Sequence, residues 1–165
     1  MWLQRHLAED DELSDFDCGV EELNVWLREH ARRAHRQRVV RVYVWVDEAE
    51  PHTVVAYAAI QPTQVTADDL TRGLGGGHSR VPGYLIARLG LHQELQSQGL
   101  GVQLLLGTLE VCVDASAVGG GRIIVIDPID AATTTFYEKY GFVPTLGAGS
   151  RLVMKVATAA AAIGG

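Results

Sequence analysis

Two glycines, placed two residues apart, lie in a short segment with the chemistry of a phosphate site. Gly99 and Gly101 belong to the run Gln96-Ser97-Gln98-Gly99-Leu100-Gly101, which follows a predicted strand and precedes an apolar helical pattern. Glycine lets the backbone approach a ligand closely, and the free amides and dipole of a beginning helix attract an anion. Because such a pair also occurs in plain turns, the segment alone is only a weak indication of phosphate binding.

A second segment, from Asp130 to Phe142, contains the adjacent aromatic residues Phe136 and Tyr137. A phenol with an ordinary pKa of about 10 can donate a proton or stabilise a developing negative charge by hydrogen bonding. The alternative is that Tyr137 is a helix residue that packs against its aromatic neighbours. Taken alone, the segment favours packing.

Basic side chains are concentrated between Arg28 and Arg41, where six arginines occur with one acid. The rest of the chain carries 8 basic and 19 acidic side chains, and the whole chain has a net charge of −6. A solvated helix face is the usual explanation of such a run. Mutual repulsion of the cations favours an anionic partner instead, either an RNA backbone or an acidic protein segment.

Length and composition indicate one soluble domain. The chain has 165 residues, of which 47% are apolar, enough to bury one core. No run approaches about 20 uninterrupted apolar residues, and the amino end turns acidic early, so we expect a cytoplasmic protein without a membrane partner. Cys18 and Cys112 lack neighbouring ligands at metal-binding spacing, so neither a disulfide framework nor a metal site is predicted.

The elements that position these segments follow from hydrophobic periodicity. Asp17 is a candidate helix cap, and the apolar residues Leu23, Trp26, Leu27, Ala31 and Ala34 predict a helix with Arg28, Arg32 and Arg36 on another face. The other predicted elements are strands over 39–46, 54–60, 84–91, 123–126 and 151–156, and helices over 102–113 and 133–140. Most of 61–83 is predicted to be a mobile loop. A frayed tail is predicted over 157–165, which leaves 1–156 as the domain.

Taken together, the glycine turn and the ending Phe136-Tyr137-Glu138-Lys139-Tyr140-Gly141-Phe142 resemble the GNAT acetyltransferase superfamily. The start, Phe16-Asp17-Cys18-Gly19 followed by Leu23-Asn24-Val25-Trp26-Leu27, is similar to its TacT/AtaT-type toxins, which acetylate the amino group of aminoacyl-tRNA and are paired with small ribbon-helix-helix antitoxins. The resemblance spans roughly 16–156. It implies an α/β (α+β) GNAT fold, with a central mixed, mostly antiparallel sheet flanked by helices and a splayed strand pair that holds acetyl-CoA.

The same resemblance implies roles for individual residues. Tyr137 matches the tyrosine that serves as general acid, and acetyl-CoA is the co-substrate with no metal required. Two positions depart from the family pattern: Asp130 stands where relatives have an Asn, and Thr133 where they have a small Ala. An ionised Asp130 can accept a hydrogen bond from the cofactor but cannot donate one. The implied cofactor-binding residues are Leu89, Gly90, Leu91, Gln96, Gln98, Gly99, Leu100, Gly101, Val102, Asp130, Thr133 and Phe136. The candidate tRNA-binding residues are Arg28, Arg32, Arg33, Arg36, Arg38 and Arg88.

The sequence leaves the acceptor and the partners open. His92 and Glu94 are candidate bases, although each is equally well explained as a turn residue. An α-amino group titrates near ~7.7–8.0 and a lysine near ~10.4, so the lack of an evident base favours an α-amine acceptor weakly. The alternatives are a GNAT enzyme acting on a small amine or a protein N-terminus, and a non-catalytic acyl-CoA-binding module. The resemblance also implies a homodimer.

Overall fold

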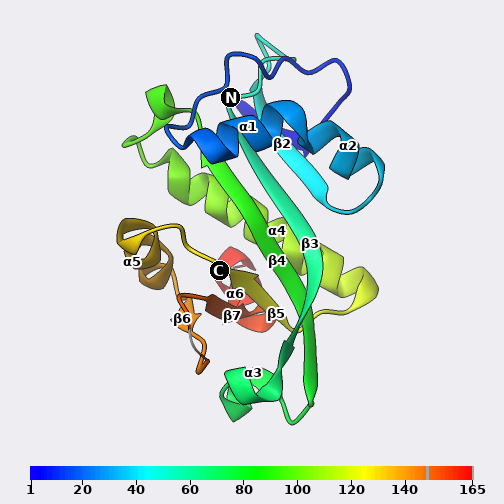
Figure 1. Cartoon of the computed structure of the whole chain (residues 1–165), viewed down its shortest axis with the longest axis vertical. Coiled ribbons are helices and arrows are strands. Elements are labelled where there is room, and N and C mark those ends of the chain that lie inside the picture. The colour runs from blue at the N-terminus through cyan, green and yellow to red at the C-terminus, as the bar shows by residue number, and fades with distance from the viewer. Residues whose placement is uncertain (148, 165) are drawn as a thin grey trace. The chain divides into compact units, whose positions relative to one another are not determined.

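The computed structural model describes residues 1–147 and 149–164. It divides into two compact units, one made of residues 1–61 and 87–108 and the other of residues 62–86 and 109–165. Each unit is described by itself below. Strands β3 (Ala56–Thr66) and β4 (Arg80–Leu91) and helix α4 (Leu100–Gly119) contribute residues to both (Figure 1).

The first unit is built on a meander of antiparallel strands. Strand β1 (Trp2–His6) pairs with β2 (Arg41–Asp47), and β2 pairs with β3 in a register that sets Arg41 opposite Ile60. The predicted hairpin over 39–46 and 54–60 is thereby confirmed, with both strands shifted slightly towards the carboxyl end. Valines at alternate positions of β2 are fully buried, as the period of two along a strand requires.

Two short helices cover the core of this unit. Helix α1 (Glu21–Glu29) and helix α2 (Ala31–Arg36) bury Leu27 and Ala31 against the valines of β2 and the side chains of Phe16 and Tyr57. One helix through this region was expected, but His30 adopts φ −123° and separates the two. Asp17 does not cap α1 as predicted. Gly19 has φ +89° and turns the chain, and the cap position falls on Val20.

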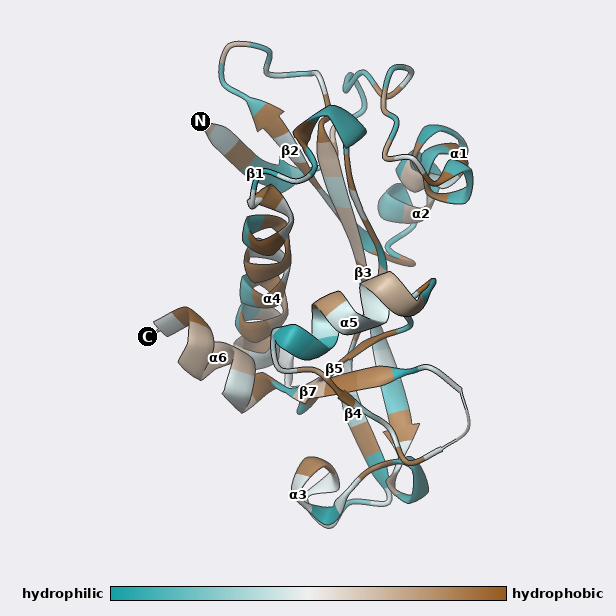
Figure 2. Cartoon of the chain, turned by 90° about the vertical axis from the view of Figure 1, so that its left-hand side faces the viewer, coloured by the Kyte–Doolittle hydropathy of each residue, from teal (hydrophilic) through white to brown (hydrophobic). Residues whose placement is uncertain are grey.

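The second unit holds the remaining strands. Strand β5 (Ile123–Ile126) pairs in parallel with β4 over Gly83 to Ile86, and its other edge pairs with the antiparallel strand β7 (Leu152–Lys155). Strand β6 (Val143–Pro144) pairs with β7. Figure 2 shows the hydrophobic colour of β5 and β7, and all four residues of β5 are buried. The strand order β1-β2-β3-β4-β5-β7-β6 gives a seven-stranded, mostly antiparallel sheet with helices, confirming the predicted fold class.

The predicted mobile loop over 61–83 is wrong. Strand β3 continues to Thr66, a short turn of 3-10 helix covers Ala67–Asp69, helix α3 covers Arg72–Gly75, and β4 begins at Arg80. These glycine-rich residues are ordered because their few apolar side chains share a core. Val65, Leu70, Leu74 and Val81 are buried together with Ile123 and Val125.

The carboxyl end also differs from expectation. Residues 156–164 form helix α6 rather than a frayed tail, and Gly165 lies outside the described residues. Alanine has the highest intrinsic helix propensity, and buried Ala159 fixes one side of this helix. Helix α5 covers Ala131–Lys139, two residues earlier than predicted at its start.

Helix α4 is long and apolar enough to cross a membrane by length and composition alone. Such a segment is weak evidence of a membrane span, because the core helix of a soluble protein passes the same test. Leu104, Leu105, Leu109 and Cys112 on α4 are buried in the protein, and Glu110 and Asp114 interrupt its apolar run. Packing inside the protein accounts for these four apolar side chains, while 28% of the apolar window of α4 is buried in all.

Candidate active site

The glycine turn lies in the first unit and leads directly into helix α4. Ser97 and Gly99 both have positive φ values, +64° and +81°, and the space around the position of a Gly99 Cβ is open. Helix α4 begins at Leu100, so the amides at its start lack acceptors within the helix and carry the positive end of its dipole. The turn therefore has the exposed amides and close backbone access that a pyrophosphate requires.

The side chain of Gln96 connects this turn to two other backbone segments by hydrogen bonds. Its side-chain amide donates to the carbonyl of Leu91 at 2.8 Å and to the carbonyl of Cys18 at 2.9 Å. The Gln98 side chain donates to the carbonyl of Glu94 at 3.1 Å. Both glutamines thus hold the backbone of the turn through their side chains, leaving the main-chain amides as the groups available to a ligand.

The Phe16-Asp17-Cys18-Gly19 segment fastens the turn from the other side. The Asp17 carboxylate accepts from the amide of Gly19 at 2.9 Å, and from the side chains of Asn24 at 2.9 Å and Gln93 at 3.0 Å. The hydrogen bond from Gly19 and the one from Asn24 lower the pKa of Asp17. The sequence predicted a helix cap at Asp17 and a family resemblance for this motif. In the structure the motif links α1 to the residues that precede the glycine turn.

The end of β4 supplies a second set of main-chain groups. The pairing of β4 with β5 covers Gly83 to Ile86, and in the described residues β4 continues to Leu91 without a β5 partner. Because successive amides of a strand point to opposite edges, those of Leu89 and Leu91 share one edge. Gly90 lies beside the core, because an added Cβ would lie 3.4 Å from the rings of Phe16 and Tyr57. Binding of an extended amide-containing arm by Leu89 and Leu91 stays a prediction.

Tyr137 lies in the second unit, on helix α5. Its side chain is only 7% exposed, and its ring contacts Phe136 and Phe142 with ring centroids 5.3 Å and 5.8 Å apart. Burial, and to a smaller extent the charge of Asp130, raise the pKa of Tyr137 to about 12. The hydroxyl therefore keeps its proton throughout the physiological range, which suits a hydrogen-bond donor or general acid and excludes a tyrosinate base near neutral pH.

Asp130 and Thr133 form a capping box at the start of α5. The Asp130 carboxylate accepts from the Thr133 amide at 2.8 Å and from the Thr133 hydroxyl at 2.8 Å. The hydrogen bonds from Thr133 lower the pKa of Asp130, so this carboxylate is ionised at neutral pH. Asp130 and Thr133, the two residues that depart from the family pattern, thus form hydrogen bonds with each other. Their contact to a cofactor stays a prediction.

The ring nitrogens of His92 are both engaged. Nδ1 accepts from the amide of Glu94 at 3.3 Å, and Nε2 lies 3.3 Å from the carbonyl of Asp15. A histidine held in this way has no free lone pair with which to take a proton from a substrate. Glu94 is exposed and its amide helps to fix His92. Neither residue is placed as an evident general base.

Some of the arginines between Arg28 and Arg41 already form ion pairs or hydrogen bonds within the protein. Arg28 pairs with Glu21 at 3.1 Å, Arg36 pairs with Glu9 at 2.9 Å, and Arg32 donates to the carbonyl of Asp11. In the part of the chain that the structure describes, no carboxylate pairs with Arg33 or Arg38, and both are exposed. The expectation of six nearly unopposed cations is therefore corrected, because Glu21 of the same helix and Glu9, 27 residues from Arg36, each pair with one of them.

His35 and Arg88 have structural surroundings of their own. Burial, followed by the charge of Arg41, lowers the pKa of His35 to about 4, so this residue adds no charge to the basic segment at neutral pH. The Arg88 guanidinium lies 4.5 Å above the ring of Trp26, which in turn stacks on Tyr57 with centroids 6.0 Å apart. This cation–π contact anchors α1 to β4 and leaves Arg88 held in place.

One group of potential cation ligands exists among the described residues. Asp10, Asp11 and His52 bring their ligand atoms within 4.8 Å of one another. The Asp11 carboxylate, however, already accepts from Arg5 at 2.6 Å and from the amide of Ala8 at 2.7 Å. The group is accounted for as an ion pair that ties β1 to the following loop.

Comparison with known proteins assigns the class that this fold and these residues define. The sequence pattern of the Acetyltransferase (GNAT) family matches residues 5–142, and the chain belongs to this family. It is an N-acetyltransferase that uses acetyl-CoA. A curated relative, the tRNA-acetylating toxin of Mycobacterium tuberculosis, is 28% identical over 138 residues, which is 84% of this chain and 82% of that protein.

Solved structures agree with the fold. AtaT complexed with acetyl-methionyl-tRNAfMet has a TM-score of 0.91 at 24% identity, covering 98% of this chain and 99% of that chain. A variant of AtaT bound to the C-terminus of the antitoxin AtaR and acetyl-CoA has a TM-score of 0.84, also at 24% identity, covering 98% and 97% of the two chains. The expected GNAT architecture is thereby confirmed over nearly the whole chain.

Proposed function

We propose that this enzyme is a toxin that transfers acetyl from acetyl-CoA to the α-amino group of aminoacyl-tRNA and thereby blocks translation. The relative that is 28% identical is named a tRNA-acetylating toxin. The observation that carries the proposal is the presence of a pyrophosphate-type turn at Gly99 in the first unit and a buried, protonated Tyr137 in the second, with no evident base among the described residues. An α-amine acceptor suits such a chain better than a lysine does.

The described residues fit acetyl-CoA. The amides of Gln98, Gly99, Leu100, Gly101 and Val102 would hold its pyrophosphate, and the β4 edge at Leu89 and Leu91 would hold the pantetheine arm. Acetyl-CoA supplies an acetyl group activated as a thioester. Gly90 lies between the two leucines, where the strand passes close to Phe16 and Tyr57.

Tyr137 stabilises the departing thiolate in this proposal. The conjugate acid of a departing thiolate has a pKa of about 8.5, well below that of a phenol raised to about 12. Complete proton transfer from Tyr137 Oη is therefore uphill, and its main contribution is a hydrogen bond that stabilises negative charge on sulfur. This refines the role of general acid that the family resemblance implies.

The partners follow from the same proposal. Relatives are found with aminoacyl-tRNA and with an antitoxin. For this chain we infer a cytoplasmic location, a ribbon-helix-helix antitoxin, and a homodimer. The last is supported by the edge strand β6 and the turn after it, where Val143 and Leu146 are 44% and 63% exposed. An apolar sheet edge of this kind favours association with another chain.

The ion pairs of Arg28 and Arg36 favour the alternative of a small-amine acceptor, because they leave fewer cations for a tRNA backbone. Variants of Arg33 and Arg38, which form no ion pair among the described residues, distinguish these two functions. The double variant Arg33→Gln/Arg38→Gln should lose at least about tenfold in activity on charged tRNA and little on a small amine such as a free amino-acid ester.

Arg36→Gln is the matched control, since Glu9 already neutralises this side chain, and its loss on charged tRNA should be smaller. Equal activity of the double variant and the wild type on charged tRNA would count against tRNA binding by this face. Robust turnover of a small amine together with no turnover of charged tRNA would favour the alternative.

A further inference from the structure

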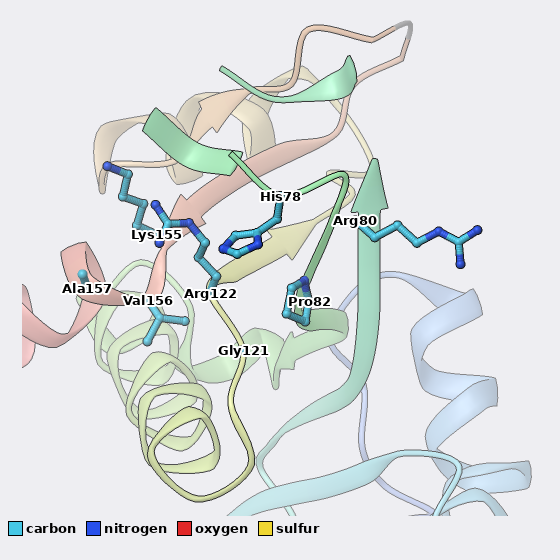
Figure 3. A pocket seen from close by; sticks show the side chains of 8 residues that line it. All are labelled: His78, Arg80, Pro82, Gly121, Arg122, Lys155, Val156 and Ala157. Carbon is cyan, nitrogen blue, oxygen red and sulfur yellow. The ribbon is translucent and has the colours of Figure 1, made fainter. Parts of the chain in front are cut away.

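A cavity of about 670 Å³ in the second unit is lined by basic side chains and by no acidic one. We call it the basic cavity, and it is bounded by His78, Arg80, Pro82, Gly121, Arg122, Lys155, Val156 and Ala157. Figure 3 shows the His78 ring on one side of the Arg122 side chain and Lys155 on the other, while the guanidinium of Arg80 points away from them. Three cationic or ionisable side chains besides Arg80 therefore line this cavity.

Adjacent strands fix two of these groups. Lys155 ends β7 opposite Ile123 of β5, and Arg122 immediately precedes that strand, where its carbonyl accepts from the amide of Val156 at 2.9 Å. The Arg122 side chain is held further by Leu74 and Gly73, whose carbonyls accept from it at 2.8 Å and 3.1 Å. The guanidinium is thus positioned in advance of any ligand.

The charges of the basic cavity are not neutralised by the protein. Among the described residues, no carboxylate forms an ion pair with Arg122 or Lys155. Helix α6 begins at Val156, directly after Lys155, and its first turn has no acidic residue. The positive end of this helix therefore adds to the positive charge of the side chains, an arrangement that favours an anion.

The chemistry of the lining indicates a phosphodiester group. An ammonium, the remaining donors of a planar guanidinium and the amides of the first turn of α6 beyond Val156 can donate to oxygens of one tetrahedral anion. The volume exceeds what an isolated phosphate needs, and Pro82 and Val156 offer apolar surface to an attached sugar. In the first unit Arg28 and Arg36 are already paired with acids, so cations elsewhere would add to those that remain for an RNA ligand.

We propose that the basic cavity is an RNA-binding site, which takes a phosphodiester group of the tRNA substrate through Lys155, Arg122 and His78. This inference rests on the proposed function, because it identifies the polyanion as the tRNA that the enzyme acetylates. It adds a contact region that the arginine-rich segment of the sequence did not reveal.

The test uses the charge-reversal variant Lys155→Glu in the full chain. An acid before the first turn of α6 is favourable for that helix, so the variant should fold. Its affinity for bulk uncharged tRNA should fall about tenfold, and the dependence of log K on log salt should flatten by about one unit, while the affinity for acetyl-CoA stays unchanged. Arg80→Gln is the control, expected within about twofold of wild type, because its side chain points away from the cavity.

His78→Gln provides a second variant, expected to weaken tRNA binding because it removes a ring that lines the basic cavity. Unchanged tRNA affinity and salt slope in both variants would overturn the inference, as would a parallel loss of acetyl-CoA affinity, which would assign the cavity to the co-substrate.

Acetylation of charged tRNA by the wild type tests the proposed function separately. If acetylation is intact but tRNA binding ignores Lys155, only the inference fails; if acetylation is absent but tRNA binding depends on Lys155, only the proposed function fails.

Discussion

The side chain of Gln96 donates a hydrogen bond of 2.9 Å to the carbonyl of Cys18, joining the glycine turn to a segment 78 residues earlier in the chain. The same amide also reaches Leu91 at the end of β4. One side chain therefore connects the amino-terminal motif, the end of the strand and the turn. These hydrogen bonds hold together the three backbone segments of the proposed co-substrate site.

Gly99→Ala tests the assignment of the glycine turn. Gly99 has φ +81°, so an alanine there costs about 1–2 kcal/mol of backbone strain, and its methyl group would also stand beside the amides at the start of α4. We expect the affinity for acetyl-CoA to fall at least about tenfold in isothermal titration calorimetry.

Gly77→Ala is the matched control for that variant, since Gly77 has φ +85° and is likewise surrounded by open space. It should lose similar stability and keep its affinity for acetyl-CoA. If both variants bind acetyl-CoA as the wild type does, the turn is not the pyrophosphate site.

Tyr137→Phe tests the catalytic assignment. Removing the hydroxyl should lower kcat by about 10²–10³, with acetyl-CoA binding retained, because the ring still packs against Phe136 and Phe142. Because the pKa of Tyr137 is raised to about 12, wild-type activity should rise as the acceptor amine deprotonates and then stay level up to about pH 10. A descending limb between pH 8 and 10 that vanishes in the variant would contradict the raised pKa.

His35 predicts how stability depends on pH. Its folded-state pKa is lowered to about 4 from 6.5, so the unfolded chain binds a proton more readily, and stability that is complete above pH 6.5 is lost as the pH falls towards 4. Allowing for partial exposure, the loss should be about 1–2 kcal/mol in urea unfolding. His35→Gln should be less stable at pH 7.5, because the Val42 amide loses its ring acceptor, yet less sensitive to acid.

His30→Gln is the control, because His30 is exposed. It should keep the pH dependence of the wild type. An acid-induced loss of the same size in His35→Gln and in the wild type would show that other groups cause it.

Elements with a clear hydrophobic period were predictable from sequence. The β2–β3 hairpin, the strand ending at Leu91, and helix α4 after the glycine turn follow from local patterns. The segment from 61 to 83 was not, because its glycines and prolines indicate a loop while the burial of Leu70 and Leu74 depends on partners such as Ile123, distant in sequence. Alanine-rich α6 was missed because low complexity was taken for disorder.

For the candidate site, too, some features were predictable from the sequence and others were not. The glycine turn and Tyr137 belong to short motifs, so their positions could be predicted from sequence, but the raised pKa of Tyr137 comes from burial that only the fold creates. Likewise, no local pattern shows that Glu9 neutralises Arg36 across 27 residues, or that Lys155 and Arg122 share a cavity. Long-range pairing decides which charges are free.

The central claim is that the acceptor is the α-amino group of an aminoacyl-tRNA, and transfer of labelled acetyl tests it most directly. Purified protein is incubated with labelled acetyl-CoA and bulk charged tRNA, and the aminoacyl moiety is released by ester hydrolysis and examined by mass spectrometry. We predict labelled N-acetyl-amino acid from at least one tRNA with the wild type and almost none with Tyr137→Phe. Absence of label on the aminoacyl moiety of every tRNA, in a preparation that binds acetyl-CoA, would contradict the claim.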